Sequence, residues 1–128
     1  MNRQLTLEEF RTRRGFLLNF ANQETIPIFA TNPLIMIKVN EYYDGTVKSM
    51  AVENKDGNFT VGVIEPGDYE FGTATIEIMT VVCGEIEAML PGETEFKMYK
   101  PFEAFRIEKD QRFKMRVTAP CSYRCQYL

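Results

Sequence analysis

The sequence contains no histidine and no tryptophan among its 128 residues. The lack of histidine excludes catalytic triads and Cys–His pairs that use an imidazole base, as well as metal sites with imidazole ligands. The chain also lacks an apolar run near the roughly 18 residues that a membrane-spanning helix needs. No apolar stretch follows Met1-Asn2-Arg3-Gln4, so we expect no secretory signal, no membrane partner and a cytoplasmic location.

The chain also lacks a paired set of cysteines and an excess of positive charge. The three cysteines, Cys83, Cys121 and Cys125, form neither an even set nor a CxxC spacing, so they indicate reduced thiols rather than a disulfide framework or a zinc site. The net charge is −3, whereas a nucleic-acid-binding protein normally carries a basic excess, so we expect no nucleic-acid partner. With 45% hydrophobic and 26% charged residues, the chain is typical of one globular domain.

The first 35 residues differ in pattern from the rest. Thr6 and Glu9 form a capping box, and apolar residues then recur at helical spacing, which predicts a helix over residues 7–21. The pairs Ile26-Pro27 and Asn32-Pro33 end this pattern. We therefore treat residues 1–35 as an N-terminal extension of a domain that spans residues 36–128.

From residue 34 onward, short apolar or alternating runs stand between turn signals such as Asp44-Gly45 and Pro66-Gly67. Phe113, Met115 and Val117 alternate with Lys114 and Arg116, which is the pattern of a strand with one buried face. Many short strands without a second helix predict an all-β sandwich or small barrel. The expected strands are residues 47–53, 59–64, 69–72, 78–83, 86–90, 96–99, 104–107, 113–118 and 122–127.

Four blocks of the sequence resemble the pyrimidine/purine nucleoside phosphorylases in order and spacing. These blocks are residues 40–49 (NEYYDGTVKS), 69–74 (YEFGTA), 77–84 (EIMTVVCG) and 122–128 (SYRCQYL). The resemblance covers residues 36–128 and implies a cupin fold, that is, a double-stranded β-helix or jelly-roll barrel, usually as a homodimer. It also implies phosphate-dependent cleavage of purine and pyrimidine nucleosides to the free base and ribose 1-phosphate, with inorganic phosphate as co-substrate and no cofactor.

The resemblance leaves several alternatives open. Met36 falls where such proteins usually start, so residues 1–35 are either an added segment that packs on the barrel or the product of an upstream start codon. The family pattern weakens at Thr75-Ile76 and in residues 101–111, which puts the rim of the pocket in doubt. A non-catalytic cupin that binds a nucleoside or a related small molecule is therefore the main alternative. A third hypothesis is that the helix at residues 7–21 docks another protein.

The metal ligands of cupins are largely missing from the corresponding positions. When the pattern is aligned on Gly84, Phe71 and Thr73 occupy two histidine positions, Glu77 the glutamate position, and Phe113 the position of the second-motif histidine. Since one carboxylate remains of four ligands, we expect no catalytic metal.

Glu77 is the candidate catalytic residue. Phosphorolysis passes through a cation-like ribosyl transition state, which a carboxylate facing the cavity can stabilise. The alternative is a solvated acid at the end of a strand. Thr73 is a candidate to add a hydroxyl group at the same rim, although threonine is also an ordinary strand residue.

Lys48 and Ser49 are candidates for binding phosphate. Lys48 shares a strand face with Met50 and Val52, which is unusual for lysine unless its ammonium group extends out to solvent. A nucleobase requires a flat apolar slot, and the candidate linings are Tyr69, Phe71, Phe105, Phe113 and Tyr123. Aromatic residues in strands are, however, more often plain core.

Overall fold

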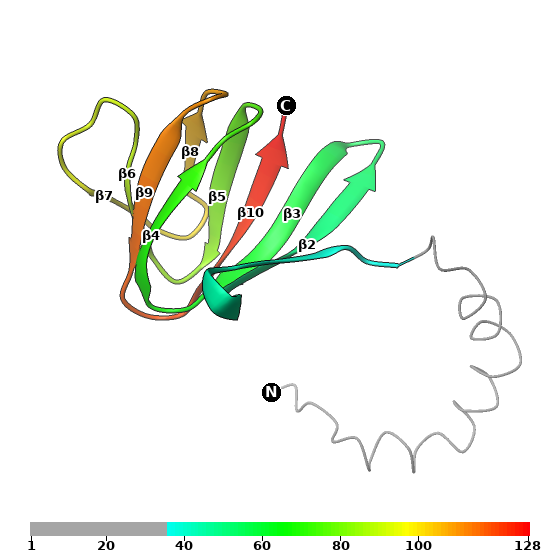
Figure 1. The fold of residues 1–128 in the computed structure, drawn as a ribbon, viewed down its shortest axis with the longest axis horizontal. Coiled ribbons are helices and arrows are strands. Elements are labelled where there is room, and N and C mark those ends of the chain that lie inside the picture. The colour runs from blue at the N-terminus through cyan, green and yellow to red at the C-terminus, as the bar shows by residue number, and fades with distance from the viewer. Residues whose placement is uncertain (1–35) are drawn as a thin grey trace, which may run out of the picture. The chain divides into compact units, whose positions relative to one another are not determined.

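The computed structural model describes residues 36–128, which form two antiparallel sheets packed face to face (Figure 1). The predicted helix at residues 7–21 lies outside the described residues. The strands and one short 3₁₀ turn are β1 (Val39–Tyr42), η2 (Tyr43–Gly45), β2 (Val47–Asn54), β3 (Gly57–Ile64), β4 (Gly67–Gly72), β5 (Glu77–Cys83), β6 (Ile86–Met89), β7 (Lys97–Tyr99), β8 (Ala104–Ile107), β9 (Arg112–Val117) and β10 (Cys121–Tyr127).

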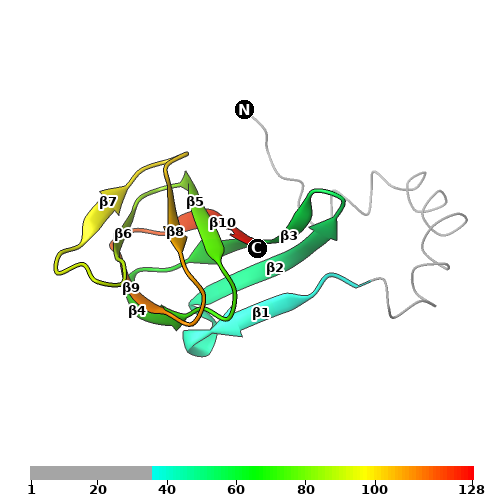
Figure 2. The ribbon, with the colours of Figure 1, turned by 90° about the horizontal axis from the view of Figure 1, so that it is seen from above.

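The larger sheet has the order β1-β2-β3-β10-β5-β8, and the smaller has the order β4-β9-β6-β7. Consecutive strands often belong to different sheets, and the C-terminal strand β10 lies between β3 and β5. Figure 2 shows β1, β2 and β3 running side by side and projecting beyond the region where β4 and β9 lie. This arrangement is the jelly-roll barrel of the cupins, so the expected all-β cupin fold is confirmed.

The core consists of the side chains that alternate inward on both sheets. On β9, Phe113, Met115 and Val117 are buried while Lys114 and Arg116 are exposed, as the sequence predicts. On β5, Met79 and Val81 are buried, but Val82 is 45% exposed. Within residues 36–128, only one face of β5 is therefore covered, although the strand lies inside the larger sheet between β10 and β8.

The outer face of the larger sheet is markedly apolar. Within residues 36–128 it carries Val39, Met50, Val52, Val61 and Val63, each more than 40% exposed. Val39 opposes Met50 across β1 and β2, and Met50 opposes Val61 across β2 and β3, so these side chains form one continuous patch.

Candidate functional site

A cavity of about 110 Å³ opens between the inner faces of the two sheets. Strands β2, β5 and β10 supply one side of it, and β4 and β9 supply the other. Its lining residues are Tyr42, Val47, Ser49, Phe71, Gly72, Glu77, Met79, Phe113, Met115, Tyr123, Cys125 and Tyr127. An apolar cavity with a few convergent polar groups is typical of a small-molecule site.

Glu77 is the acidic residue of this cavity and the first residue of β5. Its carboxylate is half-buried and accepts a hydrogen bond from the Cys125 thiol, with Sγ 3.6 Å from Oε2. Burial raises the pKa of the Glu77 carboxyl, and the Cys125 hydrogen bond opposes this effect. Across residues 36–128, no lysine or arginine lines the cavity to neutralise the carboxylate. Its negative charge is therefore poorly screened and available to a ligand.

Tyr123 and Ser49 place a pair of hydroxyl groups in the cavity. Tyr123 on β10 and Ser49 on β2 both oppose Gly62, the residue of β3 between them, so the Tyr123 ring lies over this glycine. A Cβ at Gly62 would stand 2.6 Å from Cζ of Tyr123, which shows that the ring needs a glycine there. Burial raises the pKa of Tyr123 to about 12, partly offset by its hydrogen bond with Ser49. Asn40 extends this chain, since its amide donates to Ser49 Oγ at 3.4 Å.

Tyr127 and Cys125, both of β10, line the cavity together with Glu77. The hydroxyl groups of Tyr127 and Thr60 are 2.9 Å apart and share a hydrogen bond. Burial and the nearby Glu77 carboxylate raise the pKa of the Cys125 thiol to about 12. Cys125 is therefore a neutral thiol near neutral pH and acts here as a hydrogen-bond donor to Glu77, not as a nucleophile.

Aromatic rings form the other walls of the cavity. Phe71 and Phe113 come from neighbouring strands of the smaller sheet, with ring centroids 6.1 Å apart. Tyr42 lies at the mouth, 45% exposed, and meets Phe71 edge to face at 5.7 Å. Tyr42 was not expected from the sequence, because the strand that carries it has only four residues and a mostly exposed, non-alternating pattern.

The structure thus brings four of the predicted site residues, Ser49, Phe71, Glu77 and Tyr123, to one cavity, together with the predicted lining residue Phe113.

Thr73, Tyr69 and Phe105 do not line the cavity. The Thr73 hydroxyl donates to the Glu108 carbonyl at 2.7 Å and accepts from the Gln111 amide at 3.0 Å, so it fastens the loop before β5 to the loop before β9. Tyr69 is buried and donates its hydroxyl to the Glu65 carbonyl at 2.6 Å. Phe105 packs in the core against Tyr99, with ring centroids 4.7 Å apart. For Tyr69 and Phe105, the alternative of plain core describes the packing.

Lys48 also lies away from the cavity. The face of β2 that it shares with Met50 and Val52 is the outer face, while Val47 and Ser49 point inward. Its ammonium group is exposed and lies 3.4 Å from the Glu41 carboxylate. Lys48 shares a face with Met50 and Val52, as the sequence predicts, but alternation shows which residues share a face and not which face is covered.

Arg112 is a cation that was not expected from the sequence, and its side chain lies on the exposed outer face of β9. Arg112 opposes the lining residue Gly72, and its Nη1 lies 3.4 Å from the position that a Gly72 Cβ would occupy. Its Nε donates to the exposed Glu70 carboxylate at 3.1 Å. An exposed ion pair of this kind contributes about 0–1 kcal/mol, so the guanidinium group can exchange partners readily.

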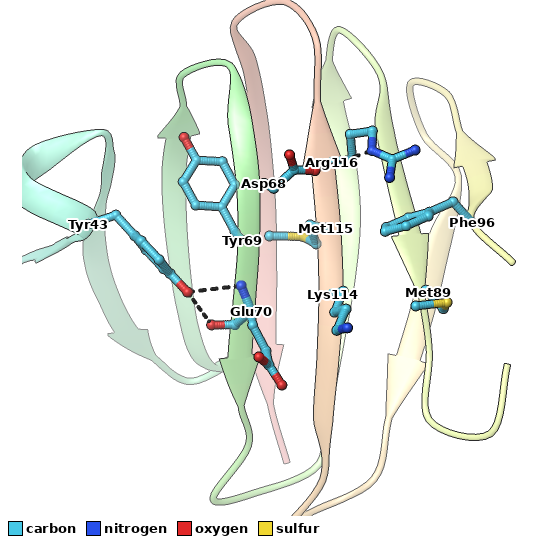
Figure 3. A pocket seen from close by; sticks show the side chains of 9 residues that line it. All are labelled: Tyr43, Asp68, Tyr69, Glu70, Met89, Phe96, Lys114, Met115 and Arg116. Atoms are coloured by element: carbon cyan, nitrogen blue, oxygen red, sulfur yellow. Dashed lines mark hydrogen bonds and ion pairs between the residues drawn. The ribbon is translucent and has the colours of Figure 1, made fainter. Parts of the chain in front are cut away.

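A larger groove, of about 410 Å³, lies on the outer face of the smaller sheet (Figure 3). It is lined by Tyr43, Asp68, Tyr69, Glu70, Met89, Phe96, Lys114, Met115 and Arg116. Asp68 is paired with Arg116 at 3.2 Å, and the Arg116 guanidinium in turn covers the Phe96 ring at 4.1 Å. The acids of the groove are thus engaged by arginines at the surface, so this groove is a weaker candidate than the cavity.

Within residues 36–128, no three Cys, Asp or Glu side chains lie together in a way that could hold a metal ion. The same part of the chain contains no helix that is long and apolar enough to cross a membrane.

The fold and the site define a small cupin with a carboxylate-bearing cavity at one end of the barrel. Solved structures share this fold. A protein of unknown function from Vibrio parahaemolyticus is 38% identical with a TM-score of 0.70, covering 73% of this chain and 99% of that one. Another, from Acinetobacter, is 25% identical with a TM-score of 0.69, covering 77% and 99%.

The family follows from the sequence comparisons. The model of the pyrimidine/purine nucleoside phosphorylase family matches residues 37–127. A pyrimidine/purine nucleoside phosphorylase from Rhodopirellula baltica is 50% identical over 91 residues, which are 71% of this chain and 99% of that protein. One from Pseudomonas putida is 47% identical over 92 residues, which are 72% and 98%. The chain belongs to the pyrimidine/purine nucleoside phosphorylase family.

Proposed function

We propose that the protein cleaves purine and pyrimidine nucleosides by phosphorolysis, with the reaction centred at Glu77. A phosphate oxygen attacks C1′ of the ribose, the bond from C1′ to the base nitrogen breaks, and the base leaves with the bonding electrons and takes up a proton. The products are the free base and ribose 1-phosphate. The observation that carries this proposal is a half-buried carboxylate that has no cation among its lining neighbours within residues 36–128, in a family named for nucleoside phosphorolysis.

Glu77 would act by electrostatic stabilisation. As the base departs, positive charge develops at C1′ and the ring oxygen of the ribose. A carboxylate in a partly dry cavity stabilises such a charge more strongly than one in water, because the local dielectric is lower. The Cys125 thiol would hold the carboxylate in place through its hydrogen bond, and the Ser49 and Tyr123 hydroxyl groups, which line the same cavity, would bind ribose hydroxyls.

The size of the cavity supports broad base specificity. Pockets that enclose a small molecule are typically about 300–1,000 Å³, whereas this cavity is about 110 Å³. It would therefore hold the sugar and the reacting bond, while the base lies at the mouth between aromatic side chains. A base that is stacked but not enclosed is recognised by its flat shape more than by its pattern of donors and acceptors.

Phosphate would be bound by Arg112 at the rim. Arg112 opposes the lining residue Gly72 across β4 and β9, and its long side chain would reach from there to the mouth of the cavity. On binding, phosphate would replace the Glu70 carboxylate as the partner of the guanidinium group. The reaction would require no metal, because Phe71 and Phe113 stand where metal cupins have histidine ligands and offer no lone pairs.

The lack of a cation in the lining within residues 36–128 also favours a second candidate, a cupin that binds nucleosides without cleaving them. One assay separates the two. Purified protein is incubated with uridine or inosine, with and without phosphate, and base release is followed by chromatography. Release that depends on phosphate supports phosphorolysis, and no release from either nucleoside at high protein concentration contradicts it.

We further propose that the protein is a homodimer in which the apolar outer face of the larger sheet is covered. Five side chains that are more than 40% exposed lie together there, and such patches are typical of interfaces. Sedimentation at micromolar concentration is expected to give twice the chain mass of 14.8 kDa. A monomer mass that does not change with concentration would contradict the dimer.

A further inference from the structure

The turn between β1 and β2 has an uncommon backbone. Tyr43, Asp44 and Gly45 are consecutive residues with φ values of 53°, 56° and 87°, all in the left-handed region. Glycine adopts this region freely, but tyrosine and aspartate do so at a cost in conformational energy. Two such residues in succession persist only where the surrounding contacts hold them.

The contacts that hold this turn come from the other sheet. The Tyr43 hydroxyl donates to the Glu70 carbonyl at 2.7 Å and accepts from the Glu70 amide at 2.9 Å (Figure 3). Glu70 belongs to β4, an edge strand, so Tyr43 satisfies backbone groups that pair with no neighbouring strand. The Tyr43 ring also meets Tyr69 and Phe71 edge to face, at 5.0 and 5.6 Å.

A second contact fixes the turn from within. The Thr46 hydroxyl donates to the Tyr43 carbonyl at 2.8 Å, and the Thr46 amide donates to the same oxygen at 3.2 Å. The turn is thus tied to its own hairpin at Thr46 and to β4 at Tyr43. It joins the two sheets at the side of the cavity where Tyr42 lies.

The residue that this turn controls is Tyr42. Tyr42 directly precedes the turn, has extended backbone angles, and places its ring at the cavity mouth against Phe71. Tyr42 lines the same cavity as Tyr123 and Ser49. Tyr42 therefore faces both an aromatic wall and the hydroxyl pair of the cavity.

We propose that Tyr42 contacts the nucleobase of the substrate and that Tyr43 is a positioning residue that holds it there. This inference rests on the proposed function for the identity of the ligand. The Tyr42 and Phe71 rings, 5.7 Å apart and nearly perpendicular, offer a flat heteroaromatic base one ring face and one ring edge. Aromatic contacts of this kind tolerate different bases because every base has a flat π surface. The pair thus provides recognition that serves purines and pyrimidines alike.

Four variants of the full chain test the proposal. Tyr42→Ala removes the contact itself. Tyr43→Phe removes only the hydroxyl that bonds to Glu70, and Thr46→Val loosens the same turn without touching β4. Tyr99→Phe is the matched control, because Tyr99 is a buried tyrosine of β7 that does not line the cavity.

Two readouts are measured on each variant. Equilibrium binding of uridine and inosine is measured without phosphate, and KM and kcat are measured with phosphate. Tyr42→Ala is expected to weaken nucleoside binding by about 5- to 100-fold, the range for loss of one base-stacking ring. Tyr43→Phe and Thr46→Val are expected to weaken it by about 3- to 10-fold with kcat less affected, while Tyr99→Phe stays within about twofold of wild type.

Fluorine NMR of protein labelled with 3-fluorotyrosine reports on positioning without any substrate. The chain has six tyrosines, so the resonances are few and are assigned by single substitutions. Tyr43→Phe and Thr46→Val are expected to shift or broaden the Tyr42 resonance, and Tyr99→Phe is not. An unchanged Tyr42 resonance in the folded Tyr43→Phe and Thr46→Val variants would overturn the positioning role of Tyr43.

The outcomes separate this inference from the proposed function. If wild-type protein binds nucleosides without cleaving them and Tyr42→Ala weakens the binding, phosphorolysis fails but the inference stands. If wild-type protein cleaves nucleosides and Tyr42→Ala behaves as wild type, the inference fails alone. If wild-type protein binds no nucleoside at all, both the proposed function and the role of Tyr42 in contacting a nucleobase are overturned.

Discussion

The cavity between the sheets and the groove on the outer face of the smaller sheet differ in the state of their charged groups. The groove is the larger, at about 410 Å³ against about 110 Å³. Its carboxylates are exposed and paired, with Asp68 on Arg116 at 3.2 Å and Glu70 on Arg112 at 3.1 Å. The Glu77 carboxylate of the cavity is half-buried and has a thiol as its hydrogen-bond donor.

This difference shows that volume is a poor guide to chemistry. Exposed ion pairs are screened by water and contribute little. A carboxylate moved away from water has a raised pKa and a stronger electrostatic effect on whatever enters beside it. The better candidate site is therefore identified by a partly buried titratable group with a raised pKa, such as Glu77, and not by the volume of the pocket.

The largest expected effect separates the two carboxylates. Glu77→Gln should lower kcat by roughly 100-fold or more, because the amide cannot stabilise positive charge at the sugar carbon. KM should change less, since the amide can still bond to ribose hydroxyls. Asp68→Asn, which neutralises an acid of the groove, should keep kcat within about twofold of wild type. Initial-rate kinetics on inosine measure both, and more than about half of wild-type kcat in Glu77→Gln would reduce Glu77 to a strand-end acid.

A second effect separates two arginines of β9. Arg112 and Arg116 each hold one surface acid, but only Arg112 opposes a lining residue of the cavity. Arg112→Gln should raise the KM for phosphate by about five- to tenfold through loss of a charge-assisted hydrogen bond. Arg116→Gln should leave it unchanged. Equal effects of the two substitutions in phosphate titrations would mean that the phosphate site lies elsewhere.

A smaller effect tests the hydroxyl pair. Gly62→Ala places a methyl group 2.6 Å from Cζ of Tyr123, so the ring must move away from Ser49. We expect activity to fall by about three- to fivefold, together with a lower melting temperature from overpacking. Val61→Ala lies on the same strand with its side chain on the outer face, away from the cavity, and because alanine keeps that face apolar it should keep full activity in the dimer. Normal activity in a folded Gly62→Ala protein would remove Tyr123 from the site.

The smallest effect concerns pH. Burial places the pKa of Glu77 in the folded state above its ordinary value of 4.5. The folded state therefore holds this proton more tightly than the unfolded state, and the resulting stabilisation is present below pH 4.5 and is lost as the pH rises through the folded pKa. Glu77→Gln lacks this loss, so its melting temperature relative to wild type should rise slightly from acidic to neutral pH. A constant difference across that range would contradict the burial of the charge.

Catalytic activity should depend on the ionisation of the same Glu77 carboxyl group. A carboxylate must be ionised to stabilise a cation, so wild-type kcat should fall as the pH drops through the raised pKa of Glu77. The residual activity of Glu77→Gln should not show this acid limb. Measuring kcat between acidic and neutral pH on both proteins checks the assignment.

The sequence predicted most of the fold. All nine expected strands are present within about two residues of their expected bounds, because alternation and turn residues are local signals. The missed strand, β1, has four residues and a mostly exposed pattern. The helix expected at residues 7–21 lies outside the described residues.

The site was less predictable, since it depends on contacts between strands. Alternation places Thr73 and Phe105 on inward positions but does not show at which end of the barrel they lie. Gly62 and Arg112 matter only because of the residues opposite them, Tyr123 and Gly72, which are fixed by register. The position of the Tyr42 ring depends on a turn with left-handed backbone angles that is held by a hydrogen bond to the other sheet.

The assignment of the cavity as the functional site is tested most directly by locating where a nucleoside binds. Titration of ¹⁵N-labelled protein with inosine, followed by the shifts of assigned amide resonances, reports on the cavity and the groove in one experiment. We expect the largest shifts at Ser49, Glu77 and Tyr123, which line the cavity. Shifts confined to Phe96, Lys114 and Arg116 would contradict this assignment, because they would place the ligand in the groove on the outer face.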